Sequence, residues 1–180
     1  SITVQSERGL VLEGMRPGRR EKTMIFSASH GGTRPARVRS EGEFTRLNGA
    51  DYRGWIEIRR KKNGLLLVVN DLGMEDYLMG VVAEEIPFDW EFDALKAQAV
   101  ASRTYALYRK RNSGKRPYHI LATVKGQVYS GRRGERASAV RAVRETEGLV
   151  LAYNGEVIPA FYHSSCGGHT EDASTIWDVK

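Results

Sequence analysis

The chain has 180 residues, of which 41% are hydrophobic and 28% charged, and its formal net charge is +6. This length allows one domain, or one domain with a small lobe, and the composition is ordinary for a folded globular protein. No apolar run is long enough to span a bilayer, and no signal peptide is recognisable in a chain that opens at Ser1 without a methionine. The single cysteine, Cys166, excludes an internal disulfide framework.

Two basic clusters, RKKNGL at 60–65 and RKRNSGKR at 109–116, contribute to the positive charge. Basic clusters serve nucleic-acid binding, attraction to an anionic cell-wall or membrane surface, or simple solvation. Neither cluster carries the interleaved aromatic residues of a base-stacking surface. We therefore expect no nucleic-acid partner, and the other two interpretations stay open.

The first 50 residues predict a β-rich portion, which we interpret as a small lobe of the same domain. Short β-type runs separated by Gly, Pro and charged residues lie at 2–4, 10–12, 23–26 and 36–38. Further on, alternating residues at 55–59, the Asn63-Gly64 pair and the apolar run 65–70 predict a β-hairpin. The second strand of this hairpin is apolar enough that we expect it to be buried.

Residues 71–109 predict two helices that meet at a short aromatic corner. Apolar residues recur at helical spacing from Met74 to Val82, and Pro87 forces the preceding residue out of the helical region. The second helix is predicted to begin near Asp93, a suitable N-cap, and its many alanines favour a helix that approaches its neighbours closely.

The corner contains an acidic pair, Glu84 and Glu85, at the end of the first predicted helix and among apolar residues. Burial penalises the charged form of a carboxylate, which raises its pKa and suits a general acid. The alternative is that both side chains are solvated residues at a helix end. The residues alone leave both interpretations open.

The last third predicts a third helix near 135–146 that stops at Gly148, followed by a hairpin formed by 149–153 and 157–162. This hairpin leads into HSSCGGHTED, where Cys166 and His169 allow three interpretations. They are a cysteine nucleophile with a histidine base, part of a metal site, or a glycine-rich turn with small residues. In total, the patterns predict an α+β fold in which β-hairpins flank a core of about three helices.

Four blocks of the sequence resemble one known family in the same order: EDYLMGVVAEEIP, ALKAQAVASRTYAL, GQVYSG and AFYHSSCGGHTEDA. This is the sporulation protein D family, also called the LytB-type or amidase-enhancer family. The resemblance covers roughly residues 51–180, which would form the catalytic domain, and it implies that the domain continues beyond Lys180. It also implies a substrate groove where the helix corner meets the HSSCGG segment.

Family members are peptidoglycan lytic transglycosylases that act on glycan strands without peptide stems. The resemblance implies that Glu85, in its Val-Val-x-x-Glu-x-Pro context, is the catalytic acid/base. Substrate-positioning roles are then expected for five further residues: His163, Ser164, Arg103, Tyr105 and Gln98. For Arg103, the alternatives are that it orients Glu85 or is an ordinary residue of a helix surface.

The resemblance also implies a location outside the cytoplasm, glycan strands as the partner, and a cell-wall amidase or another wall-remodelling protein as a further partner. The alternative function is a glycan-binding module that stimulates an amidase without catalysis. Some members bind zinc through Cys and His residues at places that are Leu121 and Lys125-Gly126 here. We therefore expect no metal and no other cofactor.

Overall fold

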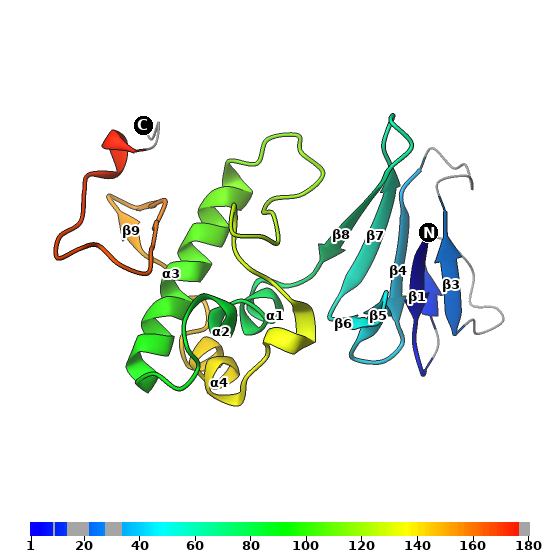
Figure 1. Cartoon of the computed structure of the whole chain (residues 1–180), viewed down its shortest axis with the longest axis horizontal. Helices are drawn as coiled ribbons and strands as arrows, with labels where there is room; N and C mark the ends of the chain where they lie inside the picture. The colour runs from blue at the N-terminus through cyan, green and yellow to red at the C-terminus, as the bar shows by residue number, and fades with distance from the viewer. Residues whose placement is uncertain (9, 14–21, 28–33, 177–180) are drawn as a thin grey trace.

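The computed structural model describes residues 1–8, 10–13, 22–27 and 34–176. The chain forms two four-stranded antiparallel sheets, followed by a group of helices and an extended C-terminal segment (Figure 1). The first sheet has the order β3-β1-β5-β6 and contains β1 (Ile2–Gln5), β3 (Thr23–Phe26), β5 (Thr45–Leu47) and β6 (Ala50–Tyr52). The second has the order β2-β4-β7-β8 and contains β2 (Leu10–Leu12), β4 (Ala36–Ser40), β7 (Trp55–Arg60) and β8 (Leu66–Asp71).

The four predicted N-terminal strands are confirmed, and β5 and β6 form a further hairpin that was not predicted. A single hydrophobic cluster fills the sheet region and includes Val4, Val38 and Ile56, all fully buried. This cluster combines residues from both sides of position 50. The division of the chain at that position stays a prediction.

The hairpin of β7 and β8 is confirmed, with Gly64 at a φ of +79° in the turn. A residue with positive φ favours glycine, which explains the Asn-Gly pair. The expectation that the second strand is buried is wrong, because the residues of β8 are half-buried and Leu65 beside it is 61% exposed. β8 is an edge strand, and residues 67–72 line an open cleft.

The helical region contains α1 (Met74–Met79), α2 (Val82–Glu85), α3 (Phe92–Arg111), the 3-10 helix η1 (Gly131–Gly134), α4 (Ala137–Glu145) and the 3-10 helix η2 (Ala173–Thr175). The first predicted helix is therefore two short helices, and α3 begins at Phe92 with Glu91 as its N-cap rather than at Asp93. The break lies at Gly80, whose carbonyl oxygen would be 2.4 Å from a β-carbon at Gly134. Glycine at 134 thus lets η1 approach the junction of α1 and α2.

The helical core is a second hydrophobic cluster, in which Leu78, Val82 and Leu95 are almost fully buried. Ala99 of α3 and Ala142 of α4 are also fully buried, as expected for helices that approach closely through alanine. Burying these apolar side chains stabilises the region by roughly 25 cal/mol for each Å² removed from water. The mixture of antiparallel sheets and helices confirms the α+β class.

The C-terminal hairpin is shorter than predicted, with only β9 (Ala152–Tyr153) and β10 (Glu156–Val157) around the turn at Asn154 and Gly155. No helix in the described part of the chain is both long and apolar enough to cross a membrane. The expectation that the domain continues beyond Lys180 is not tested, and residues 177–180 lie outside the described residues.

Candidate functional site

The carboxyl group of Glu85 lies at the end of α2, where it is partly buried against residues from two other segments. The backbone N–H of Val128 donates a hydrogen bond of 2.6 Å to its Oε1. Burial raises the pKa of Glu85, and the nearby charge of Glu84 raises it further. Hydrogen bonds from Val128 and from the Tyr162 hydroxyl favour the charged form and offset part of that rise in pKa.

Gln127 is the centre of a polar cluster behind Glu85, and its side chain is fully buried. The Tyr77 hydroxyl donates to Oε1 of Gln127 at 3.1 Å. Nε2 of Gln127 donates to the Tyr162 hydroxyl at 3.1 Å and to the Ser102 carbonyl at 3.2 Å. Because the Tyr162 oxygen accepts from Gln127, its own proton is available for the carboxylate of Glu85. Burial raises the pKa of Tyr162 to about 12, so this proton is retained at neutral pH.

Sequence reasoning missed Gln127, Tyr77 and Tyr162 as members of this site. The GQVYSG and AFYHSSCGG blocks mark the segments that contain Gln127 and Tyr162. Nothing in the order of residues indicates that the two side chains meet beside Glu85, since they are 35 positions apart.

The neighbouring Glu84 has a different environment although it is adjacent in the chain. Its side chain is exposed, and its Oε1 accepts a hydrogen bond of 2.5 Å from the Ser130 hydroxyl. The structure thus separates the acidic pair into one solvated carboxyl and one partly buried carboxyl. Of the two, only the environment of Glu85 suits a general acid.

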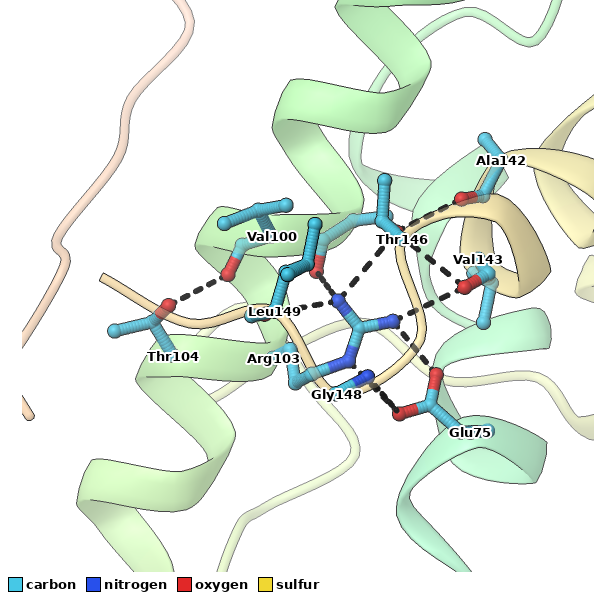
Figure 2. Close-up of polar contacts among 10 residues, drawn as sticks. Glu75, Val100, Arg103, Thr104, Ala142, Val143, Thr146, Gly148 and Leu149 are labelled. Carbon is cyan, nitrogen blue, oxygen red and sulfur yellow. Dashed lines mark hydrogen bonds and ion pairs between the residues drawn. The ribbon is translucent and has the colours of Figure 1, made fainter. Parts of the chain in front are cut away.

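Arg103 is buried, with a side chain that is 3% exposed, and its guanidinium bonds to protein groups. Figure 2 shows its paired contact with the carboxylate of Glu75, at 2.8 and 2.6 Å. Its remaining N–H groups donate to the carbonyls of Val143 and Leu149, both at 3.2 Å. This geometry contradicts the alternative of an exposed helix-surface residue, and the described contacts of Arg103 do not include Glu85. The expected roles in substrate contact and in orienting Glu85 stay predictions.

Tyr105 and Gln98 support the cluster from α3. The Tyr105 side chain is buried, and its ring packs edge-on against that of Tyr162 with 6.2 Å between the centroids. Gln98 is half-buried and donates to the Ser102 hydroxyl at 3.0 Å. Tyr105 thus contacts the site through Tyr162, and direct contact of either residue with substrate stays a prediction.

His163 and Ser164 directly follow Tyr162 and are exposed, so the structure places them at the surface beside the cluster. Cys166 is also exposed, and His169 lies 3.5 Å from a carboxylate oxygen of Glu171. Among the described residues no three His, Cys, Asp or Glu side chains come together in a way that could hold a metal ion. The roles of His163 and Ser164 stay predictions, as does the expected lack of a cofactor.

Among the clefts in the described part of the molecule are two of about 480 and 440 Å³, and neither of these is lined by Glu85. The larger one lies on the first sheet, with residues such as Gln5, Arg8 and Arg46 in its wall. Tyr77 lines the smaller one, so this cleft borders the Gln127 cluster. The groove expected between the helix corner and the HSSCGG segment stays a prediction.

Comparisons with known proteins find several relatives. The amidase enhancer of Bacillus subtilis is 40% identical over 100 residues, which cover 56% of this chain and 13% of that protein. Stage II sporulation protein D of Bacillus subtilis is 32% identical over 124 residues, covering 61% of this chain and 36% of that protein. An uncharacterized protein of Brachyspira hyodysenteriae is 41% identical over 134 residues, covering 74% of this chain and 36% of that protein.

The chain therefore spans little more than a third, or less, of the length of these relatives. A family model, SpoIID, described as "Stage II sporulation protein", matches residues 62–153, just over half of the chain. The matched range contains Glu85 and Gln127 and ends at the first strand of the C-terminal hairpin. The chain belongs to the stage II sporulation protein D family.

Proposed function

We propose that this chain is a lytic transglycosylase that cleaves the bond between N-acetylmuramic acid and N-acetylglucosamine in glycan strands without peptide stems. The observation that carries the proposal is the partly buried carboxyl of Glu85, whose pKa is raised by burial. A raised pKa increases the protonated fraction of the carboxyl group across its titration range, and general acid catalysis requires the protonated form.

In the proposed reaction, protonated Glu85 first gives its proton to the glycosidic oxygen, so that the N-acetylglucosamine leaves as an alcohol. The resulting carboxylate then takes the proton of the muramic C6 hydroxyl, whose oxygen closes a 1,6-anhydro ring on C1. The carboxyl ends in its starting protonation state, and no water is consumed. The Val128 N–H and the Tyr162 hydroxyl hold the carboxylate between the two steps.

This scheme needs one carboxyl group, whereas ordinary glycoside hydrolysis needs a pair. Among the described carboxyl groups whose pKa is shifted, that of Glu85 is raised, while those of Asp51 and Asp172 are lowered by hydrogen bonds. An acid whose pKa is lowered is a poor proton donor at neutral pH. Glu85 is thus the described carboxyl group that suits the proton-donating step.

A second candidate is a glycan-binding module that stimulates a cell-wall amidase without cutting the strand. It is favoured by the printed name of one relative, amidase enhancer, at 40% identity. Both candidates imply cell-wall glycan as the ligand and a location outside the cytoplasm, and an amidase would be a partner in the second.

Mass spectrometry of stem-free glycan strands after incubation with the protein tests the first candidate. We expect products that end in 1,6-anhydromuramic acid. Reducing muramic ends would instead indicate hydrolysis. Intact strands that remain bound to the protein would support the binding module.

Replacing Tyr162 with Phe tests how the carboxyl is held. The Tyr162 hydrogen bond lowers the pKa of Glu85, so its loss should raise that pKa further. Because the protonated form is the active one, the fall of kcat/KM with rising pH should begin at a higher pH in the variant. We expect the maximal rate to drop by about tenfold through poorer positioning of the carboxyl.

The pH profile of kcat/KM measures this shift, and Tyr153→Phe is the matched control, since that side chain is 72% exposed. The control should keep the wild-type profile. A fall that begins at the same or a lower pH in Tyr162→Phe would contradict the assigned contact.

A further inference from the structure

The cleft of about 440 Å³ separates the second sheet from the helices. Residues 67–72, mostly of β8, form one wall, and the end of α3 with the loop 117–122 forms the other. Figure 1 shows the β7–β8 hairpin and the loop after α3 rising on either side of this space. The rings of Tyr77, Tyr118 and Tyr129 contribute to the lining. We call this space the basic cleft, for the basic residues that flank it.

Two basic segments flank the cleft. Leu67 in its wall pairs with Arg59, and the hairpin turn continues from there into Lys61 and Lys62. On the other side the lining contains Lys110, with Arg111 beside it in the chain. The lining also contains two carboxylates, Glu57 and Asp71, and both are ion-paired with Arg37. Lys61, Lys62, Lys110 and Arg111 are all exposed.

The charge of the molecule is concentrated at these segments. Residues 57–62 contain four basic residues and one acidic residue, and residues 109–116 contain five basic residues and no acidic one. Together they carry +8, whereas the whole chain carries +6, so the remainder has a net charge of −2. Within the two segments, the ion pair among the described residues is that of Arg59 with Glu57, which leaves most of this charge uncompensated. Such a concentration attracts a polyanion.

We propose that the basic cleft is a second binding site for the glycan strand, one that recognises the free lactyl carboxylates of its muramic acid residues. This inference rests on the proposed function, since it takes the stem-free strand as the ligand. Such a strand carries a carboxylate on every muramic acid, whereas a peptide stem converts the same group into a neutral amide. Lysine and arginine side chains bind carboxylates through charge-assisted hydrogen bonds.

The cleft and Glu85 border the same polar cluster around Gln127. Tyr77 lines the cleft, and its hydroxyl donates to Gln127, which in turn donates to Tyr162 beside Glu85. The apolar and aromatic lining offers surfaces for sugar rings between the charged groups. The cleft would thus select strands from which the stems have been removed.

The test measures binding in a Glu85→Gln background, where strands are not expected to be cut. The cleft variant carries Lys61→Gln, Lys62→Gln, Lys110→Gln and Arg111→Gln. The control variant removes four exposed arginines outside the cleft, by Arg132→Gln, Arg133→Gln, Arg136→Gln and Arg144→Gln. Each protein is sedimented with stem-free strands and with the same strands after chemical reduction of their carboxyl groups to alcohols.

We expect the cleft variant to bind stem-free strands about tenfold more weakly than its parent, since four solvent-exposed charge contacts are lost. The control variant should lose less than twofold in affinity for stem-free strands. The affinity for the reduced strands should be equally low with and without the cleft substitutions. High salt should reduce the difference between parent and cleft variant.

Three results would overturn the proposal: an equal loss in the control variant, an undiminished affinity for reduced strands, or tighter binding at the cleft of a phosphodiester polymer such as teichoic acid or DNA. The result of this binding test can be separated from the result of the test of the proposed function. If wild-type protein forms no anhydromuramic ends, the catalytic proposal fails while the binding comparison still decides whether the cleft recognises carboxylates.

Discussion

Replacing Glu85 with Gln is expected to reduce the formation of anhydromuramic ends by about 10²- to 10⁴-fold, the range in which general acid–base catalysis contributes. The amide cannot give a proton to the glycosidic oxygen or take one from the C6 hydroxyl. Its oxygen can still accept the hydrogen bond from the Val128 N–H, so the fold and the binding of glycan should be retained. Quantitative mass spectrometry of products and sedimentation with stem-free strands measure the two properties.

Glu84→Gln is the matched control, because the two glutamates are adjacent and differ in environment. Glu84 is exposed and bonds to Ser130, and its charge contributes only a part of the rise in the pKa of Glu85. We expect activity within about twofold of wild type. If Glu84→Gln were the inactive variant, or if Glu85→Gln retained full activity, the assignment of the acid/base would be wrong.

Local signals in the sequence were sufficient for several elements of the fold. The Asn63-Gly64 pair fixed the β7–β8 hairpin, because a tight turn with positive φ has few alternatives. The alanine-rich pattern likewise identified α3, whose Ala99 packs against the neighbouring helices without solvent exposure. Both features depend on residues close together in the chain.

The errors came from contacts between distant residues. The break at Gly80 depends on η1, which comes 51 residues later and approaches the junction of α1 and α2 through Gly134. In the same way, the strand β8 has the composition of a buried strand, but it lies at a sheet edge beside a cleft. Neither arrangement is visible in the local pattern of residues.

The candidate site shows the same division. Glu85 was identified through resemblance, and its apolar surroundings made a raised pKa reasonable in advance. The buried network of Gln127 with Tyr77 and Tyr162 joins three segments, so it could not be foreseen. The role expected for Arg103 came from the same resemblance, and its burial was not foreseen, because the carboxylate that compensates it comes from another helix.

The pair of Arg103 and Glu75 leads to the largest expected change in stability. Replacing Glu75 with Gln leaves the guanidinium, 3% exposed, without a counter-charge among the helices. Breaking a buried ion pair by removing one partner is strongly destabilising. Because Glu75 is itself 26% exposed, we expect the free energy of unfolding to fall by about 3 kcal/mol, at the low end of what such a loss costs. Urea unfolding measures this loss.

Glu145→Gln provides the contrast, because Glu145 pairs with Arg141 on the exposed surface of α4 at 2.8 Å. Removing that pair should cost about 0.3–0.5 kcal/mol, as expected for an i,i+4 pair in solvent. A similar cost for both variants would contradict the structural role assigned to Arg103. The comparison holds the chemical change constant and varies only the burial of the partner.

Arg103→Lys separates stability from substrate contact. Lysine keeps the charge but cannot make the paired contact with Glu75 while also reaching the carbonyls of Val143 and Leu149. If Arg103 only joins α1, α3 and the end of α4, the variant should unfold at lower urea while its folded molecules keep the wild-type KM. If it bound a sugar, KM would rise even where the protein is fully folded. The carbonyls of Val143 and Leu149 lie at and beyond the end of α4, and α4 packs against α2 and α3. Losing the bonds to them should therefore also make the position of α2, which carries Glu85, less well defined.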